Sequence, residues 1–223
     1  MSVDLKGGIS KRFDLVSKTG LWNQHKENIL LDLSSKRWSV IDNFLPHCSF
    51  KQLAIAASRD YQEGLLKPAT VGKSKKRREK VRGDAIRWVQ RSNCHPSIYP
   101  ILDIIDNLQE NLRQQLFLPL QENESHFAVY PPGTFYVKHL DCHRNQNNRI
   151  LTFILYLNRR NWSKANGGQL RMYMDKHEFV DINPIGNRLV LFDSSVFYHE
   201  VLPATRPRMS YTGWMRRNST FGS

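Results

Sequence analysis

Hydrophobic residues recur every three or four positions along the stretch that follows Ile98, which is the spacing of one face of an α-helix. A second stripe of the same kind begins near Ser49. Together the stripes predict two helices, each with an apolar face suited to packing against a sheet. Their apolar positions are Ile101, Leu102, Ile105, Leu108, Leu112 and Leu116 in the first, and Leu53, Ala56, Ala57 and Tyr61 in the second.

Upstream of these helices the pattern is less regular. Residues 1 to about 35 mix charges with weak periodicity, which predicts an irregular or helical arm packed on the outside of the protein. Residues 38–45, WSVIDNFL, read as a strand that ends at Pro46.

From about residue 124 the pattern changes to short hydrophobic runs separated by turn residues, a spacing typical of an all-β sandwich or barrel. We therefore expect one domain, 1–223, that is mainly β with supporting helices. Its core, residues 124–216, would be a double-stranded β-helix, or jelly roll, packed against N-terminal helices within 1–123. The predicted strands are 127–130, 135–140, 150–157, 169–174, 179–182, 189–192 and 209–215.

Composition is that of a folded, soluble protein, with 40% hydrophobic residues and no apolar run near the roughly 18 residues that a membrane span needs. The charged N-terminus lacks the pattern of a secretory signal. The three cysteines, Cys48, Cys94 and Cys142, form no CxxC pair. We expect a cytoplasmic protein with free thiols and no membrane partner.

Two side chains that bind metals share one face of a predicted strand. In the segment YVKHLD, period-two alternation points His139 and Asp141 the same way. One more histidine would complete a facial triad of two His and one carboxylate, which suits non-haem Fe(II). His143 continues the alternation into a polar stretch, Glu200 would add a second carboxylate, and His199 could close the site from across the barrel. An incidental HxD pair on the surface is the alternative.

The last predicted strand places polar side chains on its inner face, which a core strand does only where something polar lies inside. An arginine there is well matched to a carboxylate, because its guanidinium donates two parallel hydrogen bonds. On the strand at 150–157, Tyr156 lies on the face opposite the fully apolar one, and its phenol could join the arginine on the same carboxylate. The inner face of the last strand consists of Arg208, Ser210, Thr212 and Trp214.

These segments resemble the catalytic core of the prolyl 4-hydroxylase family of Fe(II)/2-oxoglutarate-dependent oxygenases, specifically the oxygen-sensing type that acts on hypoxia-inducible factor and its bacterial relatives. The matching text is YPPGTFYVKHLD, LTFILYLN, GGQLRMY and HEVLPATRPRMSYTGW, in the order that the family has. A fifth segment, VRGDAIRW at 81–88, resembles the substrate-side element of that family.

Carried over residue by residue, the resemblance implies a set of roles. The iron ligands would be His139, Asp141 and His199, and Arg208 would complete the catalytic set by binding the distal carboxylate of 2-oxoglutarate. The cofactors would be Fe(II), 2-oxoglutarate and O2, with ascorbate as a supporting reductant. The family places Tyr156, Thr212, Tyr130 and Trp214 around the cosubstrate, and Arg82, Asp84 and Arg149 at the substrate-binding mouth.

The resemblance also implies an activity: hydroxylation of a protein prolyl residue at C4, with succinate and CO2 as further products. The bacterial relatives point to a translation factor such as elongation factor Tu. Two alternatives stay open, namely hydroxylation of another residue in a ribosomal or nucleic-acid-associated protein, and a non-catalytic binding module of the same fold. Nucleic acid itself is not expected as the substrate, because the sequence has no helix-turn-helix, zinc-finger or RNA-binding signature.

The net charge of +13 favours an acidic partner. Part of this charge lies in the run KSKKRREK at 73–80. The run is either a solvated loop or, since related enzymes have a mobile loop before the VRGD segment, an electrostatic clamp for an acidic protein substrate.

Overall fold

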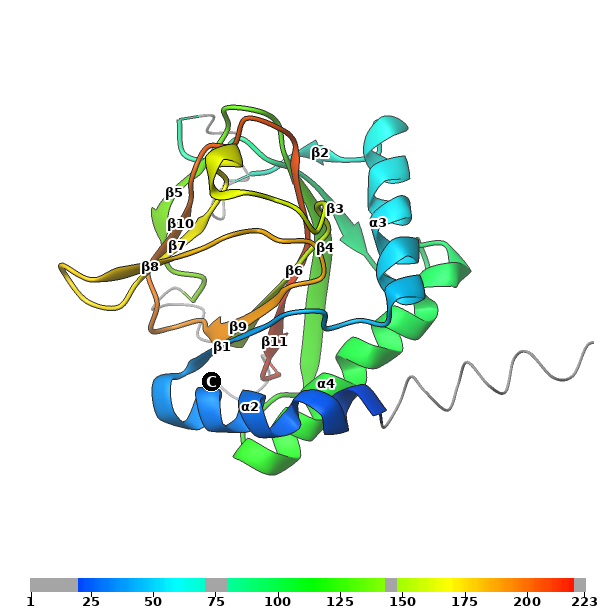
Figure 1. The fold of residues 1–223 in the computed structure, drawn as a ribbon. Coiled ribbons are helices and arrows are strands. Elements are labelled where there is room, and N and C mark those ends of the chain that lie inside the picture. Colours follow the sequence, from blue (N-terminus) through cyan, green and yellow to red (C-terminus); the bar gives the residue numbers. More distant parts are fainter. Residues whose placement is uncertain (1–19, 71–79, 143–147, 219–223) are drawn as a thin grey trace, which may run out of the picture.

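The computed structural model describes residues 20–70, 80–142 and 148–218, which form two antiparallel sheets and three α-helices (Figure 1). The larger sheet has the strand order β1-β9-β6-β11-β4-β3-β2, and the smaller has the order β5-β10-β7-β8. The two sheets face each other, as in the jelly roll that the strand spacing predicts. The helices are α2 (Gly20–Lys36), α3 (His47–Gln62) and α4 (Tyr99–Leu116), with short 3-10 turns η1 (Pro96–Ile98) and η2 (Lys164–Asn166).

The strands of the two sheets interleave along the chain. Those of the larger sheet are β1 (Trp38–Ile41), β2 (Lys67–Pro68), β3 (Ala85–Val89), β4 (Glu122–Tyr130), β6 (Arg149–Tyr156), β9 (Leu189–Asp193) and β11 (Arg208–Arg216). Those of the smaller sheet are β5 (Tyr136–His139), β7 (Leu170–Tyr173), β8 (Phe179–Ile182) and β10 (His199–Val201).

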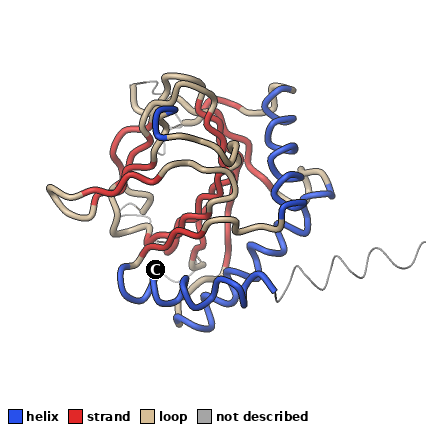
Figure 2. Tube along the Cα trace, in the orientation of Figure 1, coloured by secondary structure: helices blue, strands red, loops and turns tan. Residues whose placement is uncertain are grey.

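The helices cover one face of the larger sheet, and the smaller sheet covers the other, as Figure 2 shows by colour. Alternation along β6 explains the division. Phe153 and Leu155 pack with the helices, whereas Ile154 and Tyr156 point into the space between the sheets. The apolar stripe of α4 is buried in the helix-side cluster, which confirms the packing that its periodicity predicts.

Three details differ from the expectations. The predicted strand at 38–45 ends at Ile41, because Asn43 adopts a left-handed conformation and Leu45 is instead held by Asn187 through its backbone N–H and carbonyl. The arm before residue 36 contains α2, which contributes the buried Ile29 to the core instead of lying wholly outside it. Strands β2, β3 and β10 were not predicted. β2 and β10, with two and three residues, are too short to show an alternation, and β3 lies in the segment VRGDAIRW, for which no strand is predicted.

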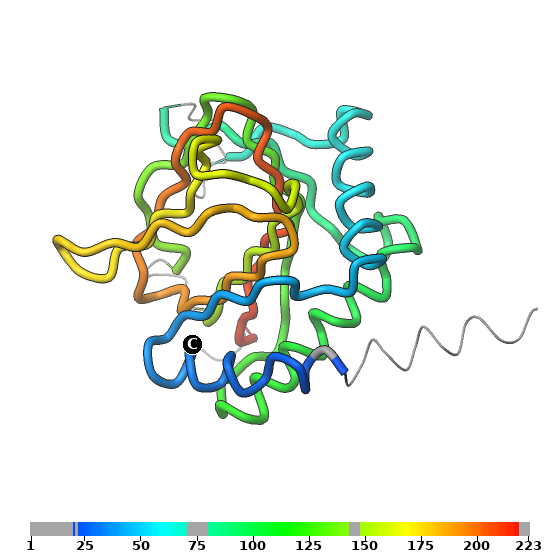
Figure 3. Tube along the Cα trace, viewed as in Figure 1, coloured from blue at the N-terminus to red at the C-terminus, as the bar shows by residue number. Residues whose placement is uncertain are grey.

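One end of the space between the sheets is closed by two loops far apart in the sequence. The loop after β6 and the connection from β10 to β11 run side by side (Figure 3), joined by an isolated bridge between Gly167 and Ala204. The backbone N–H of Gly168 also donates to the carbonyl of Pro203 at 2.9 Å. This closure lies at the end of β11 where Arg208 begins the strand.

Candidate metal and cosubstrate site

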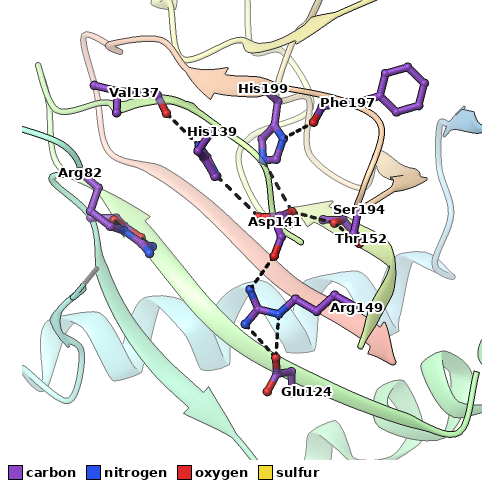
Figure 4. Close-up of polar contacts among 11 residues, drawn as sticks. Arg82, Glu124, Val137, His139, Asp141, Arg149, Thr152, Ser194, Phe197 and His199 are labelled. Carbon is purple, nitrogen blue, oxygen red and sulfur yellow. Dashed lines mark hydrogen bonds and ion pairs between the residues drawn. The ribbon is translucent and has the colours of Figure 1, made fainter. Parts of the chain in front are cut away.

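Three predicted ligands converge at the mouth between the sheets. His139 is the last residue of β5, Asp141 follows it, and His199 begins β10, directly opposite His139 in the antiparallel pairing. One carboxylate oxygen of Asp141 lies 3.6 Å from Nε2 of His139, and the other lies 3.6 Å from Nε2 of His199. The potential ligand atoms of the three residues all lie within 4.8 Å of one another, as Figure 4 illustrates.

The other two candidates for the third metal ligand are Glu200 and His143. Glu200 follows His199, so its side chain points to the opposite face of the small sheet, where it accepts a 2.6 Å hydrogen bond from the hydroxyl of Tyr173. His143 lies outside the described residues. Among the residues that the structure describes, His139, Asp141 and His199 form the one group of three or more His, Cys, Asp or Glu side chains arranged to hold a metal.

Each ligand is oriented by a second contact. Nδ1 of His139 lies 2.8 Å from the carbonyl of Val137, and Nδ1 of His199 lies 3.1 Å from that of Phe197. A carbonyl only accepts, so each Nδ1 carries the proton and each Nε2 presents its lone pair to a metal. Thr152 donates a 2.7 Å hydrogen bond to Asp141.

The electrostatic state of the cluster also suits a metal. Burial lowers the pKa of His199 to about 4, so the ring is neutral near pH 7. Burial alone would raise the pKa of Asp141, but the neighbouring His199 and His139 and the Thr152 hydroxyl hold it below its usual range. Two neutral imidazoles and one carboxylate are the donor set of the facial triad of non-haem Fe(II), which leaves three coordination positions open.

Arg208 lies deeper between the sheets, with 2% of its surface exposed. Its Nε donates to the carbonyl of Gly168 at 2.9 Å, but its Nη2 has no hydrogen-bond partner among the described residues. The hydroxyl of Tyr156 is likewise buried without a partner, and the Tyr156 ring centre lies 5.0 Å from the guanidinium carbon. Buried polar groups are nearly always satisfied, so these two donors fit a carboxylate ligand.

A glycine pair makes room for this arginine. Gly167 and Gly168 both have positive φ, and a Cβ on Gly168 would lie 3.2 Å from Cδ of Arg208 and 3.0 Å from Cβ of Ala204. The carbonyl of Gly167 accepts from the indole of Trp162 at 2.9 Å, which fixes the turn. The GG of the segment GGQLRMY thus lets the backbone approach Arg208 closely.

The other residues expected around the cosubstrate are divided between the two ends of β11. Tyr130 pairs with Arg208 in the sheet, and its ring centre lies 5.1 Å from the guanidinium carbon. Thr212 lies on the same face, with its hydroxyl 2.9 Å from that of Ser210. Trp214 is farther along, beside the metal end, where it pairs with Thr152.

The three residues expected at the substrate mouth are each held in internal contacts. Arg82 forms two hydrogen bonds with the carboxylate of Asp84, at 2.7 and 2.5 Å. Arg149 donates to Glu124 at 2.8 Å and to the backbone carbonyl of Asp141 at 3.3 Å (Figure 4). Its guanidinium carbon lies 3.5 Å from the ring centre of Trp214.

Two further residues, Tyr136 and His126, contact residues of the site, although the sequence pattern predicts no role for them. Tyr136 stacks on His139 with 3.6 Å between ring centres, and His126 lies between Trp88 and Trp214, at 5.1 and 5.4 Å. Burial lowers the pKa of His126 to about 4. Trp88 ends the segment VRGDAIRW at 81–88, whereas nothing in the sequence marks His126. Of the basic run at 73–80, residues 73–79 lie outside the described residues.

Comparison with known proteins gives consistent matches. Residues 125–216 match the family described as the 2OG-Fe(II) oxygenase superfamily. The human protein named prolyl hydroxylase EGLN3 is 34% identical in an alignment of 201 positions that covers 84% of this chain and 82% of the relative. The hypoxia-inducible factor prolyl hydroxylase of Caenorhabditis elegans is 31% identical over 84% of this chain, but the chain spans 28% of that protein.

Solved structures of prolyl hydroxylases are also similar to this chain. A prolyl-4-hydroxylase of Pseudomonas putida has a TM-score of 0.77 and 39% identity, covering 86% of this chain and 98% of its own. A prolyl hydroxylase of Trichoplax adhaerens, solved with a peptide of the hypoxia-inducible factor oxygen degradation domain, has a TM-score of 0.80 and 27% identity, covering 91% and 95% of the two chains. No helix in the described parts of this chain has the length and apolar character needed to cross a membrane.

Proposed function

Because this chain belongs to the 2OG-Fe(II) oxygenase superfamily and is homologous to prolyl hydroxylases, we propose that it hydroxylates a prolyl residue of a protein at C4. The proposal rests on the presence of a metal-binding group and a carboxylate-binding group in the same interior. A buried His-Asp-His triad lies at the mouth, and an arginine and a tyrosine with unpartnered donors lie deeper in the same interior. Phe192 connects them, since it packs in the cluster of Tyr156 and its ring centre lies 4.9 Å from that of His199.

The residues divide the work between holding the metal and holding the cosubstrate. His139, Asp141 and His199 would bind Fe(II), while Arg208 and Tyr156 would take the distal carboxylate of 2-oxoglutarate. When bound, iron and 2-oxoglutarate supply the oxidising chemistry with O2, which yields succinate and CO2 beside the hydroxylated product. The apolar cluster around Phe192 excludes water from that chemistry.

The substrate would cross the mouth beside Arg149 and Trp214, where Trp88 exposes 43% of its surface. The family resemblance to bacterial enzymes makes a translation factor such as elongation factor Tu our first candidate. An acidic partner is favoured by the surplus positive charge of the whole chain. The arginines at the mouth do not themselves supply that charge, because Asp84 and Glu124 neutralise Arg82 and Arg149.

The test is direct. The purified protein is incubated with Fe(II), 2-oxoglutarate, ascorbate and either elongation factor Tu or a cell lysate, and hydroxylated residues are mapped by mass spectrometry. We expect 4-hydroxyproline, formed together with succinate, in the wild type and none in Asp141→Ala. Glu200→Gln is the matched control, because its carboxylate points away from the site and the activity should persist.

Two outcomes would contradict the proposal. Hydroxylation confined to a residue other than proline would favour the alternative substrate class, which the charge of +13 also suits. A protein that consumes no 2-oxoglutarate in the presence of iron would support the non-catalytic binding module.

A further inference from the structure

We infer that Arg82 and Asp84 act as positioning residues for the metal ligand His139, through the ring of Tyr136. The inference rests on the metal site of the proposed function, but not on the identity of the substrate. It assigns to these two residues a task different from the substrate contact that the resemblance implies, and it adds Tyr136 to the groups that hold the site.

The four side chains form a continuous column. The Tyr136 ring lies nearly parallel to His139, with 3.6 Å between centres and 18° between planes. The guanidinium carbon of Arg82 lies 4.4 Å from the Tyr136 ring centre. Since the imidazole covers one face of the phenol, the cation occupies the other face, where it is attracted by the ring electrons.

Asp84 fixes the far end of the column. It accepts two hydrogen bonds from Arg82, and the Asp84 side chain is fully buried, with 14% of the Arg82 side chain exposed. A bidentate pair orients the guanidinium plane as well as neutralising it. Because removing one partner would leave a buried charge uncompensated, the pair holds Arg82 in this geometry firmly.

The backbone joins the same two segments. Residues 81–83 lie antiparallel to β5: the N–H of Val137 donates to Val81, and that of Gly83 donates to Phe135, both at 2.9 Å. A Cβ on Gly83 would lie 2.7 Å from Cβ of Thr134, so glycine is required for this approach. The column is therefore built on a rigid strand pairing.

His139 needs this support more than the other ligands do. It is the last residue of β5 and the most exposed member of the triad, with 15% of its side chain accessible, compared with 7% for Asp141 and 5% for His199. Its hydrogen bond to Val137 fixes one ring edge, and the stack on Tyr136 fixes the plane. Losing a hydrogen-bond partner of a ligand typically costs about 10- to 100-fold in metal affinity, and we expect the loss of the stack to have an effect at the lower end of that range.

The contacts that Arg82 and Asp84 make within the protein favour a positioning role for them over a role in contacting the substrate. Both oxygens of Asp84 accept from Arg82, and the guanidinium covers Tyr136. A residue that only contacts the substrate changes KM for the protein substrate and leaves metal binding alone. A positioning residue changes metal affinity when no substrate is present.

The experiment measures Co(II) binding to the metal-free protein by the visible absorption of the ion, without 2-oxoglutarate or substrate. Co(II) is the probe because it occupies Fe(II) sites without oxidising in air. We expect Kd to rise about tenfold or more in Tyr136→Leu and in Arg82→Gln. Tyr136→Phe keeps the stacked ring and should bind within about twofold of wild type.

A second pair of variants tests whether breaking a similar cluster away from the metal site would also change Co(II) affinity. On the outward face of β7, Arg171 forms the same bidentate pair with Asp181, at 2.8 and 2.9 Å, and lies 4.0 Å from the ring centre of Phe179. Tyr173 contacts the Lys138 ammonium there at 3.6 Å. Arg171→Gln and Tyr173→Leu should leave both the Co(II) affinity and the shape of its spectrum unchanged.

Unaltered Co(II) affinity in Tyr136→Leu and Arg82→Gln, with an increase only in KM for the protein substrate, would overturn the inference. So would an equal loss of affinity in the two control variants. A wild-type protein that binds no Co(II) would refute the metal site itself. Wild-type binding with no effect of the column variants would refute the column alone.

Discussion

The hydroxyl of Thr152 donates to Oδ2 of Asp141 at 2.7 Å, so a strand of the larger sheet holds a metal ligand that follows a strand of the smaller one. Thr152→Val keeps the shape and removes this hydrogen bond. We expect about a tenfold loss of Co(II) or Fe(II) affinity, measured by titration, because second contacts of ligands carry such effects. Ser195→Ala, at an exposed hydroxyl nearby, is the control. Wild-type affinity in Thr152→Val would contradict this assignment.

Gly168→Ala is expected to weaken 2-oxoglutarate binding about tenfold or more, because its Cβ would press on Cδ of Arg208. The measurement is calorimetric titration of the metal-loaded protein. Gly64→Ala is a matched control: its φ of +68 is close to the +73 of Gly168, but nothing lies within 4 Å of the added Cβ. Both variants should lose about 1 kcal/mol of stability to backbone strain. Equal loss of 2-oxoglutarate affinity in the two would exclude the contact with Arg208 as the cause.

Tyr156→Phe separates stability from binding. The hydroxyl has no partner in the described structure, so its removal should leave the free energy of unfolding of the cosubstrate-free protein unchanged or slightly higher. A hydrogen bond to a carboxylate contributes about 1.5–3 kcal/mol, so 2-oxoglutarate affinity should fall by at least about tenfold. Chemical denaturation and calorimetry give the two numbers. A large loss of stability with normal binding would show that the phenol serves the fold and not the cosubstrate.

The stability of the metal-free protein should fall as pH drops from 6.5 towards 4. Burial lowers the pKa of His126 and of His199 to about 4, whereas both would titrate near 6.5 in the unfolded chain. Between these values the unfolded state binds protons that the folded state does not, so acidification favours unfolding, by up to about 1.4 kcal/mol per pH unit for each group. Urea unfolding with a chelator at pH 7, 6 and 5 measures the slope.

His126→Phe keeps an aromatic ring between Trp88 and Trp214 and removes one of these titrations. The fall in stability with pH should therefore be shallower in this variant. If the free energy of unfolding fell equally steeply with pH in the variant and in the wild type, His126 would not titrate as its burial implies.

Alternation along strands explains why much of the site was predictable. The period of two puts His139 and Asp141 on one face, and Arg208 and Thr212 on one face, without knowledge of any register. Arg208 and Thr212 lie in the single strand β11, whereas β5 ends at His139 and Asp141 follows it. The choice of His199 over Glu200 depended on which face of the three-residue strand β10 points inward, and so short a strand shows no pattern of its own. The family resemblance, and not periodicity, made that choice.

Contacts between residues of different strands could not be predicted from the sequence pattern. Alternation puts Thr152 on the same face as Tyr156, but its hydrogen bond to Asp141 depends on how the two sheets face each other. The Tyr136 stack depends on the pairing of residues 81–83 with β5, and the bond from Arg208 to Gly168 depends on loop closure. These relationships come from tertiary packing, which a one-dimensional pattern does not encode.

The division of the metal ligands between the sheets has a mechanical consequence. His139 and His199 belong to the smaller sheet, while Asp141 is tied through Thr152 to the larger one. A bound metal therefore links the two sheets. At a free metal concentration of 100 times Kd, binding would add about 2.7 kcal/mol to the free energy of unfolding. Iron availability would then govern how long the folded protein resists proteolysis in the cell, independently of whether it turns over.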